Sequence, residues 1–202
     1  YQARAIIIAS GLQHRRLEVL GEDKFLGKGL SYCATCDGNF YKNLDVCVVG
    51  GGNTALEDAL YLSNICNHVY LIHRREKLRG DKYLIDLLNK KDNVSFIYDS
   101  VVKEICGNDK INSVLLLNKV TNKEVSVNVS GVFVAVGYEP SSSVFNNIIN
   151  LDERGYIKSD DCTTNVSGIF VAGDVRSKKL RQLVTAASDG AIAATLAVSY
   201  LK

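Results

Sequence analysis

The chain has 202 residues, of which 47% are hydrophobic and 23% charged, and its formal net charge is +2 at pH 7. This is the composition of a globular protein that can bury a core without metal ions or disulfide staples. The balanced charge excludes a surface built as a whole for nucleic acid or for an anionic membrane, so we expect neither as a partner. No transmembrane run or secretory signal is evident in the sequence, and a cytoplasmic protein is expected.

The first half of the chain predicts alternating strands and helices. A buried strand is expected at 5–9, and the polar, glycine-punctuated stretch 21–29 is expected to be a linker. A second strand at 46–49 runs into a glycine triplet, and apolar residues spaced as one face of a helix follow over 54–66. Next in order we expect a strand at 69–72, a helix at 81–89 and a strand at 94–98.

The second half continues the same alternation. Residues 113–117 and 125–127 predict two strands joined by a turn. The runs 132–137 and 169–173 each end in glycine, as central parallel strands do. The Ala-rich stretch 183–201 predicts a long buried helix. Together these elements predict an α/β fold in layers.

A glycine-rich turn follows the second predicted strand. It reads Gly-Gly-Gly-Asn-Thr-Ala from Gly50 to Ala55, which places the pattern G-x-G-x-x-A between a strand and a helix. Gly50 permits the tight turn, Gly52 lets the backbone approach a pyrophosphate, and Ala55 allows close helix–strand packing. Asn53 and Thr54 lie at the helix start, which faces the anion. A flexible glycine turn without a ligand is the alternative.

The end of the next predicted strand indicates which dinucleotide binds. An NAD site would place Asp or Glu about 20 residues after the first glycine, to bind the ribose hydroxyls. Here the strand ends in His73-Arg74-Arg75, with Arg79 following, and Arg74 lies 24 residues after Gly50. Guanidinium groups suit a 2′-phosphate, and each charge-assisted contact is worth about 1.5–3 kcal/mol. NADPH is therefore favoured over NADH, with a solvated basic helix face as the alternative.

The sequence contains one close pair of cysteines, Cys33 and Cys36, followed by Asp37. Two intervening residues let a disulfide close across a single turn, and Asp37 could carry the proton that thiol–disulfide exchange releases. A zinc site, which needs two more ligands, and a purely structural pair are the alternatives. The remaining cysteines are expected to be buried small hydrophobic residues: Cys47, Cys66, Cys106 and Cys162.

In combination and in this order, the motifs resemble those of the small, bacterial-type thioredoxin reductases, over residues 5–201. The matching segments are Cys-Ala-Thr-Cys-Asp-Gly from Cys33, Gly-Gly-Gly-Asn-Thr-Ala from Gly50, His-Arg-Arg from His73, Ala-Gly-Asp-Val from Ala172 and Arg-Gln from Arg181. The resemblance implies a Rossmann-like NADPH-binding domain, with the redox cysteines, inserted into an FAD-binding domain of the pyridine nucleotide-disulfide oxidoreductase type. It implies that residues 21–128 form the NADPH-binding domain and that 1–20 and 129–202 belong to the FAD-binding domain.

The resemblance also implies roles for individual residues. Cys36 would face the flavin, Cys33 would attack thioredoxin, and Asp37 would be the acid–base group. Gly173 and Asp174 would meet the ribityl–phosphate region of FAD, and Arg181, Gln182 and Ala186 would lie near the isoalloxazine. Gly11 is a further expected cofactor-binding residue. The family resembled is homodimeric and cytoplasmic, with thioredoxin as its partner.

Two departures from the family pattern lead to further expectations. Family members begin with their own G-x-G-x-x-G motif for the ADP half of FAD, and we expect that segment to be absent from this chain. A nucleotide-binding fragment without turnover is therefore one alternative, and the flavoprotein subunit of an alkyl hydroperoxide reductase system is another. Relatives often carry one more residue, commonly Met, between Asp161 and Thr164, and this sequence contains no Met. We expect the natural chain to hold a further residue beside Cys162-Thr163.

Overall fold

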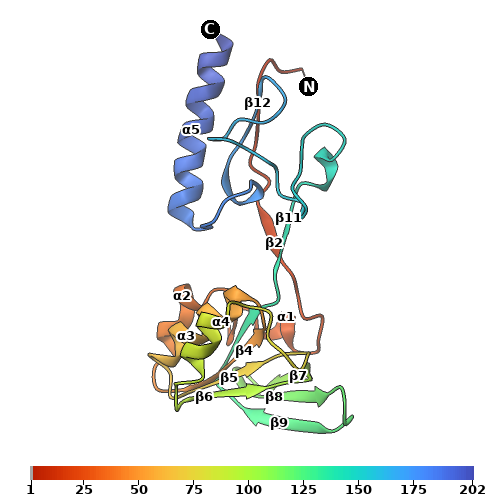
Figure 1. Ribbon diagram of the computed structural model, residues 1–202, viewed down its shortest axis with the longest axis vertical. Helices are drawn as coiled ribbons and strands as arrows, with labels where there is room; N and C mark the ends of the chain where they lie inside the picture. Colours follow the sequence, from red (N-terminus) through yellow and green to blue (C-terminus); the bar gives the residue numbers. More distant parts are fainter. Residues whose placement is uncertain (1) are drawn as a thin grey trace. The chain divides into compact units, whose positions relative to one another are not determined.

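The computed structural model describes residues 2–202 and divides into two compact units (Figure 1). Unit 1 consists of the chain up to Arg15 together with Tyr138–Lys202, and unit 2 is the continuous segment Arg16–Gly137.

Unit 2 is built on a five-stranded parallel sheet with the strand order β3-β10-β4-β5-β6. The strands are β3 (Leu30–Ser31), β10 (Gly131–Ala135), β4 (Asp45–Gly50), β5 (His68–Ile72) and β6 (Val94–Ile97). Among the helices of the unit are α2 (Ala34–Asp37), α3 (Asn53–Ser63) and α4 (Lys82–Leu88). A 3₁₀ turn, η1 (Gly38–Tyr41), follows α2 directly. The predicted strand–turn–helix–strand order around the glycine triplet is confirmed.

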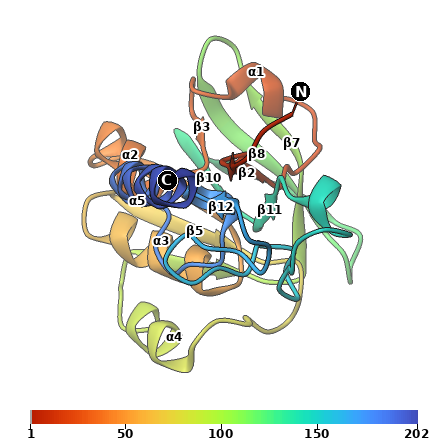
Figure 2. The ribbon, with the colours of Figure 1, turned by 90° about the horizontal axis from the view of Figure 1, so that it is seen from above.

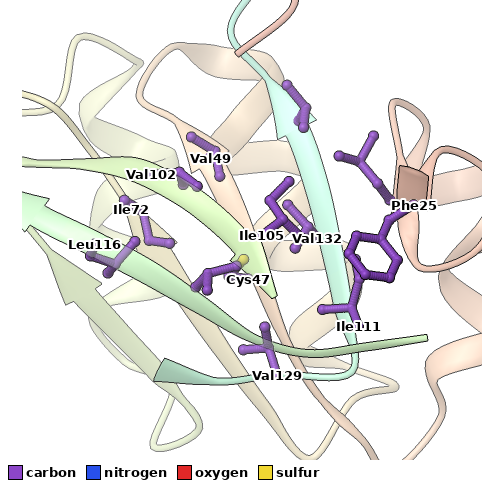
Figure 3. Close-up of a cluster of buried hydrophobic side chains, with 13 residues drawn as sticks. Phe25, Cys47, Val49, Ile72, Val102, Ile105, Ile111, Leu116, Val129 and Val132 are labelled. Carbon is purple, nitrogen blue, oxygen red and sulfur yellow. The ribbon is translucent and has the colours of Figure 1, made fainter. Parts of the chain in front are cut away.

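The central strands of this sheet are buried on both faces, so their residues alternate between two cores. Val46 and Val48 of β4 pack with the residues of α3, whereas Cys47 and Val49 point to the opposite face. That opposite face is covered by an antiparallel sheet of β7 (Ser100–Gly107), β8 (Ile111–Asn118) and β9 (Glu124–Asn128). Figure 3 shows this second core, where Cys47 and Val132 lie among the side chains of the antiparallel strands. Unit 2 is therefore a three-layer structure of helices, parallel sheet and antiparallel sheet.

The stretch 21–29, expected as a linker, is a packed part of unit 2. It contains helix α1 (Glu22–Phe25), and both Glu22 and Phe25 are buried. The Glu22 carboxylate accepts hydrogen bonds from the backbone N–H groups of Leu17 and Glu18 at 2.9 and 2.8 Å and from the Tyr32 hydroxyl at 2.8 Å. The three hydrogen bonds to Glu22 and the burial of Phe25 fix this segment in place, which the glycine spacing did not indicate.

The domain boundary predicted at residue 128 was too early. Strand β10 lies between β3 and β4 and pairs in parallel with both, so residues 131–135 are interior to the sheet of unit 2. At the other boundary, unit 2 begins at Arg16 and not at residue 21. Long-range strand pairing decides both limits, and local sequence carries little information about it.

Unit 1 contains two short two-stranded sheets. Strand β1 (Ile6–Ile8) pairs in parallel with β12 (Ile169–Val171), with Ile7 opposite Phe170, so the two predicted strands share one sheet as expected. Strand β2 (Leu12–His14) pairs antiparallel with β11 (Tyr138–Pro140). Two 3₁₀ turns, η2 (Ser143–Phe145) and η3 (Gly173–Val175), complete the unit with helix α5.

Helix α5 (Leu183–Leu201) has the predicted length but not the predicted burial. Only Asp189, Ala193 and Ala197 are buried, at four-residue spacing, and they face β1 and β12. A single two-stranded sheet covers one stripe of a helix, which is why most of α5 is exposed. Figure 2 views this helix along its axis.

By length and apolar composition alone, α5 could cross a membrane, and it is the one such helix among residues 2–202. Core helices of soluble proteins pass the same test. Asp189 lies in the middle of α5 and is bonded to Arg176 and Lys178 of the same unit. An ion-paired carboxylate at that position speaks against a lipid-facing span.

Candidate functional site: a redox disulfide and a glycine turn in unit 2

Cys33 and Cys36 form a disulfide with their Cα atoms 5.3 Å apart. Helix α2 begins directly after Cys33, and the Sγ atom of Cys33 accepts a hydrogen bond from the Cys36 N–H at 3.2 Å. Cys36 is exposed and Cys33 is half-buried. The predicted disulfide, in one short turn at a helix start, is confirmed, and it is open to a reaction partner.

Ser31 links this disulfide to Asp37. Its hydroxyl donates to the Asp37 Oδ2 atom at 2.6 Å and accepts from the Cys33 N–H at 3.0 Å. Ser31 itself is buried, whereas Asp37 is half-buried. Burial and the nearby negative charge of Asp37 raise the pKa of Tyr41. The carboxylate therefore has a fixed place beside the redox pair, and sequence reasoning did not identify the residue that holds it.

The other cysteines lie apart from this pair. Burial raises the pKa of Cys47 strongly and that of Cys66 to about 11, with the charge of Asp45 adding to the latter shift. Cys162 is also buried, as expected, but Cys106 is only half-buried. Within residues 2–202 no three His, Cys, Asp or Glu side chains form a group that could hold a metal ion.

Of the three glycines in the turn, Gly52 has room for a Cβ atom, whereas Gly50 and Gly51 do not. A Cβ atom on Gly50 would lie 2.5 Å from the Ala135 carbonyl oxygen and 2.7 Å from the Ala55 Cβ, so only glycine fits there. A Cβ on Gly52 would meet no atom within 4 Å. Gly52 is also the N-cap of α3 and gives the helix no side-chain cap, and the first two residues of the helix, Asn53 and Thr54, are exposed. Backbone donors beside an open glycine fit a pyrophosphate group.

The basic segment lies at the same edge of the sheet. Strands β4 and β5 are neighbours with Val49 opposite Ile72, so the glycine turn and the segment from His73 onward leave the sheet side by side. The side chains of Arg74, Arg75 and Arg79 are exposed. Across the described chain, none of these three guanidinium groups is ion-paired to a carboxylate. They are available to an anion.

His73 differs from the three arginines. It is only 4% exposed, and its Nδ1 atom lies 3.1 Å from the Gly50 carbonyl oxygen, while its buried Nε2 atom has no hydrogen-bond partner among residues 2–202. Burial lowers its pKa, and the charges of Arg79 and Arg75 act in the same direction. The imidazole packs behind Gly51, where a Cβ would lie 2.1 Å from Nδ1. His73 therefore supports the turn from within, rather than facing solvent as a phosphate ligand would.

A second contact of this region was not anticipated from the sequence. The Asn53 side chain donates from Nδ2 to Asp81 Oδ2 at 2.7 Å and accepts from the Asp81 backbone N–H at 2.8 Å. Asp81 is the first residue of the helix predicted at 81–89, and in the structure it is the N-cap of α4. Its partner, 28 residues earlier in the chain, was not predicted.

In unit 1, five of the predicted flavin-contacting residues come together around η3. Gly173 has a φ of 77°, and a Cβ there would lie 3.9 Å from the Cβ of Ala186. The Arg181 Nε atom lies 3.4 Å from the Asp174 carbonyl oxygen, and its guanidinium stacks 4.1 Å from the centre of the Tyr156 ring. Gln182 is the N-cap of α5 and forms a capping box with Thr185.

Gly11 stands outside this group. It precedes β2 in a left-handed conformation, with φ 71°, and its carbonyl accepts from the Ser141 N–H at 3.0 Å. None of its hydrogen bonds within residues 2–202 leads to the residues around η3.

Asp189 of α5 forms hydrogen bonds with residues in and just after η3. Its carboxylate accepts from the Gly173 N–H at 3.1 Å, from Arg176 at 2.7 Å and from Lys178 at 2.9 Å. Burial by itself would raise the pKa of Asp189, but the hydrogen bonds from Arg176 and Lys178 outweigh it and lower that pKa. Asp189 carried no motif signal, because an isolated Asp in an apolar helix has no local pattern.

Comparison with known proteins decides the family. Residues 1–190 match the model of the pyridine nucleotide-disulphide oxidoreductase family. The chain belongs to this family. It is similar over its whole length to the thioredoxin reductases of Listeria innocua, at 46% identity, and Rickettsia conorii, at 47%. It spans 64% and 66% of those two proteins, which is just under two-thirds of their length.

Solved structures of thioredoxin reductases also match the fold of this chain. The thioredoxin reductase of Streptococcus pyogenes matches 98% of the chain with a TM-score of 0.91 at 45% identity, and the chain covers 65% of it. The thioredoxin reductase of Giardia duodenalis matches 98% of the chain with a TM-score of 0.90 at 37% identity, again over 65% of its own length. The α/β fold predicted from the sequence is thereby confirmed.

This family uses FAD and NADPH, and the residues around η3 can be tested for their fit to FAD. Within the part of the chain that the structure describes, the Asp174 Oδ1 atom is buried without a hydrogen-bond partner, although the Lys178 ammonium lies 3.4 Å away. An orphaned carboxylate oxygen beside a left-handed glycine suits a hydroxyl donor such as that of a ribityl chain. The residues present in unit 1 thus fit the part of FAD that the sequence resemblance implies for them.

Proposed function

We propose that this chain is the NADPH-binding and disulfide-bearing part of a thioredoxin reductase. The observation that carries the proposal is the reactive disulfide with Asp37 beside it, in the same unit as an open glycine turn flanked by three unpaired arginines. Unit 2 then corresponds to the NADPH-binding domain, and unit 1 to part of the FAD-binding domain.

The nucleotide would be held along the edge of the sheet where β4 and β5 end. The backbone from Gly50 to Ala55, including Asn53 and Thr54 at the start of α3, would receive the pyrophosphate. Arg74, Arg75 and Arg79 would bind the 2′-phosphate that distinguishes NADPH from NADH.

FAD, when bound, would supply the two-electron relay between NADPH and the disulfide. Gly173 and Asp174 would hold its ribityl–phosphate region, and Arg181, Gln182 and Ala186 would lie near its ring system. Gly11 would be a further cofactor-binding residue. These assignments follow the family pattern. For Asp174, its orphaned oxygen supports them.

The exchange step uses this chain's own residues. After two-electron reduction of the disulfide, the Cys33 thiolate attacks a sulfur of the partner disulfide and forms a mixed disulfide, releasing one partner thiolate. The Cys36 thiolate then attacks Cys33, which re-forms the internal disulfide and releases the second partner thiolate. Asp37 holds or transfers the proton of the Cys36 thiol. The electrons balance, because one disulfide is reduced as the other is re-formed.

A protein substrate is supported by Phe40, which lies on the 3₁₀ turn η1 that follows Asp37 and is 80% exposed. A large aromatic side chain left in water beside a reactive disulfide is suited to docking a partner protein such as thioredoxin. Phe40→Ala should raise the KM for thioredoxin while leaving reduction of a small aromatic disulfide unchanged. The same loss with both substrates would contradict a docking role. A homodimer and a cytoplasmic location belong to the same proposal.

Binding and turnover test the proposal separately. Titration calorimetry at low salt should show at least about a hundredfold preference for NADPH over NADH, since two lost charge-assisted contacts cost that much. Equal dissociation constants would refute the nucleotide assignment. NADPH oxidation with thioredoxin, with and without added FAD, then tests turnover. NADPH binding without a flavin spectrum or turnover would identify a nucleotide-binding fragment, and turnover with a peroxidase partner alone would identify a hydroperoxide reductase subunit.

A further inference from the structure

The first residue of α3 and the residue before α4 are joined side chain to side chain. Asn53 donates to the Asp81 carboxylate at 2.7 Å and accepts from the Asp81 backbone N–H at 2.8 Å. Two hydrogen bonds between the same two residues define both a distance and an orientation. The pair therefore connects the glycine turn directly to the far end of the segment that carries the arginines.

The same segment is held against the glycine turn at two further points and against α3 at one. The Arg79 N–H donates to the Gly51 carbonyl oxygen at 2.7 Å, so the backbone at this arginine is bonded to the turn. A Cβ on Gly80 would lie 2.3 Å from Leu56 Cδ1, which shows how closely the backbone approaches α3 there. At its start, the segment is anchored by His73 against the Gly50 carbonyl oxygen.

Asp81 is an unexpected residue at this place for two reasons. As the N-cap of α4 it forms no side-chain cap to its own helix, although such a cap typically contributes about 0.5–2 kcal/mol. It also places a carboxylate two residues from Arg79, where simple electrostatics would weaken the binding of an anion. Neither helix capping nor charge attraction explains the residue, whereas its bonds to Asn53 do.

We propose that Asn53 and Asp81 form a positioning pair that holds the arginine segment at the correct distance from the pyrophosphate turn. The pair thereby determines the preference for a 2′-phosphorylated dinucleotide. This inference rests on the proposed binding of NADPH. Neither residue needs to contact the 2′-phosphate, because the pair acts through the position of Arg79 and its neighbours.

The test measures dissociation constants for NADPH and NADH, by calorimetry at one low salt concentration, on the 202-residue chain and its variants. The preference for NADPH is the dissociation constant for NADH divided by that for NADPH. Asn53→Ala and Asp81→Ala should each lower this ratio by about tenfold, which is near the upper value for lost hydrogen bonds. The double variant should lower it no further than Asn53→Ala alone, because Asn53→Ala already removes both hydrogen bonds of the pair. Using the ratio cancels any effect on the pyrophosphate, which both cofactors share.

The direction in which Asp81→Ala changes the preference for NADPH distinguishes a positioning role of Asp81 from a purely electrostatic one. Removing a carboxylate near the arginines would strengthen NADPH binding if charge alone mattered. A raised or unchanged preference for NADPH in Asp81→Ala overturns the inference. The exchange variant Asn53→Asp with Asp81→Asn keeps both hydrogen bonds with the polarity of the side-chain bond reversed, and it should restore most of the preference.

A matched control lies at the opposite end of β4. Asn67 donates to Asp45 at 2.6 Å, which is an Asn–Asp pair of the same chemistry remote from the glycine turn. Asn67→Ala should change neither the ratio nor either constant, and thermal melting of every variant reports folding. Equal affinity of the unchanged chain for both cofactors would reject the nucleotide assignment itself. An intact preference in the unchanged chain and in the Asn53 and Asp81 variants would reject the positioning pair alone.

Discussion

The hydroxyl of Ser31 lies 2.6 Å from the carboxylate of Asp37, and the same hydroxyl accepts the N–H of Cys33. One buried side chain thus holds both the carboxylate and the backbone at the entrance to the redox turn. If Asp37 is the acid–base group, its position relative to the disulfide depends on Ser31.

Ser31→Ala should slow thiol–disulfide exchange by about tenfold or more, since a correctly placed acid–base group contributes about 10²–10⁴-fold and is only misplaced here, not removed. Stopped-flow reduction of thioredoxin by the pre-reduced chain measures this rate. Ser63→Ala is the control, because Ser63 is another buried serine of unit 2 and its hydroxyl bonds only the Leu60 carbonyl, at 2.7 Å. Equal rates for both variants and the unchanged chain would show that Ser31 has no role in exchange.

Two adjacent glycines should respond differently to substitution by alanine, one through protein stability and the other through cofactor binding. A Cβ on Gly51 would lie 2.1 Å from the buried His73 ring, so Gly51→Ala should destabilise unit 2 by about 1–3 kcal/mol through overpacking. A Cβ on Gly52 meets nothing within 4 Å, so Gly52→Ala should fold normally but bind NADPH and NADH more weakly, because the methyl group occupies the path of the pyrophosphate. Urea unfolding and calorimetry measure the two effects. The idea fails if Gly52→Ala binds both cofactors normally.

The ion pairs of Asp189 predict an acid-sensitive unit 1. The pKa of this carboxyl is lowered in the folded chain, so its stabilising effect is present above the unfolded pKa and is lost as the pH falls below about 4. Asp189→Ala should cost about 3–5 kcal/mol at pH 7, because it leaves Arg176 and Lys178 without their shared partner.

The difference between Asp189→Ala and the unchanged chain should narrow between pH 5 and pH 3 in denaturant titrations, the region that spans the ordinary pKa of Asp at about 3.9. Glu153→Ala, a change at an exposed carboxylate of the same unit, should show no such dependence. A constant difference across this pH range would mean that the charge of Asp189 does not contribute.

The turn at Asp161 and Cys162 is the place where a further residue was expected. Both residues are left-handed, with φ of 40° and 69°, and the Thr163 N–H closes the turn on the Asp160 carbonyl oxygen at 2.8 Å. A left-handed residue other than glycine costs roughly 1–2 kcal/mol. Insertion of Met between Cys162 and Thr163 lengthens the turn and should raise the melting temperature of unit 1 by several degrees, about 4–8 °C per kcal/mol for a small domain.

Asp161→Gly provides the comparison for that insertion, because it relieves one left-handed residue without changing the length of the turn. It should raise the melting temperature by a smaller amount. A lower melting temperature for the inserted chain would show that the present turn is the natural one.

The amino-acid sequence by itself predicted the features that depend on local geometry. The disulfide between Cys33 and Cys36 needs only two intervening residues and a helix start, and the glycine turn needs only the strand before it and the helix after it. The strand that ends just before His73, Arg74 and Arg75 was also predicted, and β5 confirms it. The periodicity of apolar residues and the spacing of motif residues predict such features, because each feature lies within about ten consecutive residues.

Only the tertiary structure determines which distant residues contact these features. Strand β10 lies between β3 and β4, His73 packs behind Gly51, and Asn53 bonds Asp81 across 28 residues. Each of these contacts depends on which strands pair and in what register, and a residue's own neighbours in sequence do not encode its distant partner. The residue types of the proposed nucleotide site could be predicted from local sequence. The distance between its two segments is set only when the parallel sheet brings the ends of β4 and β5 side by side.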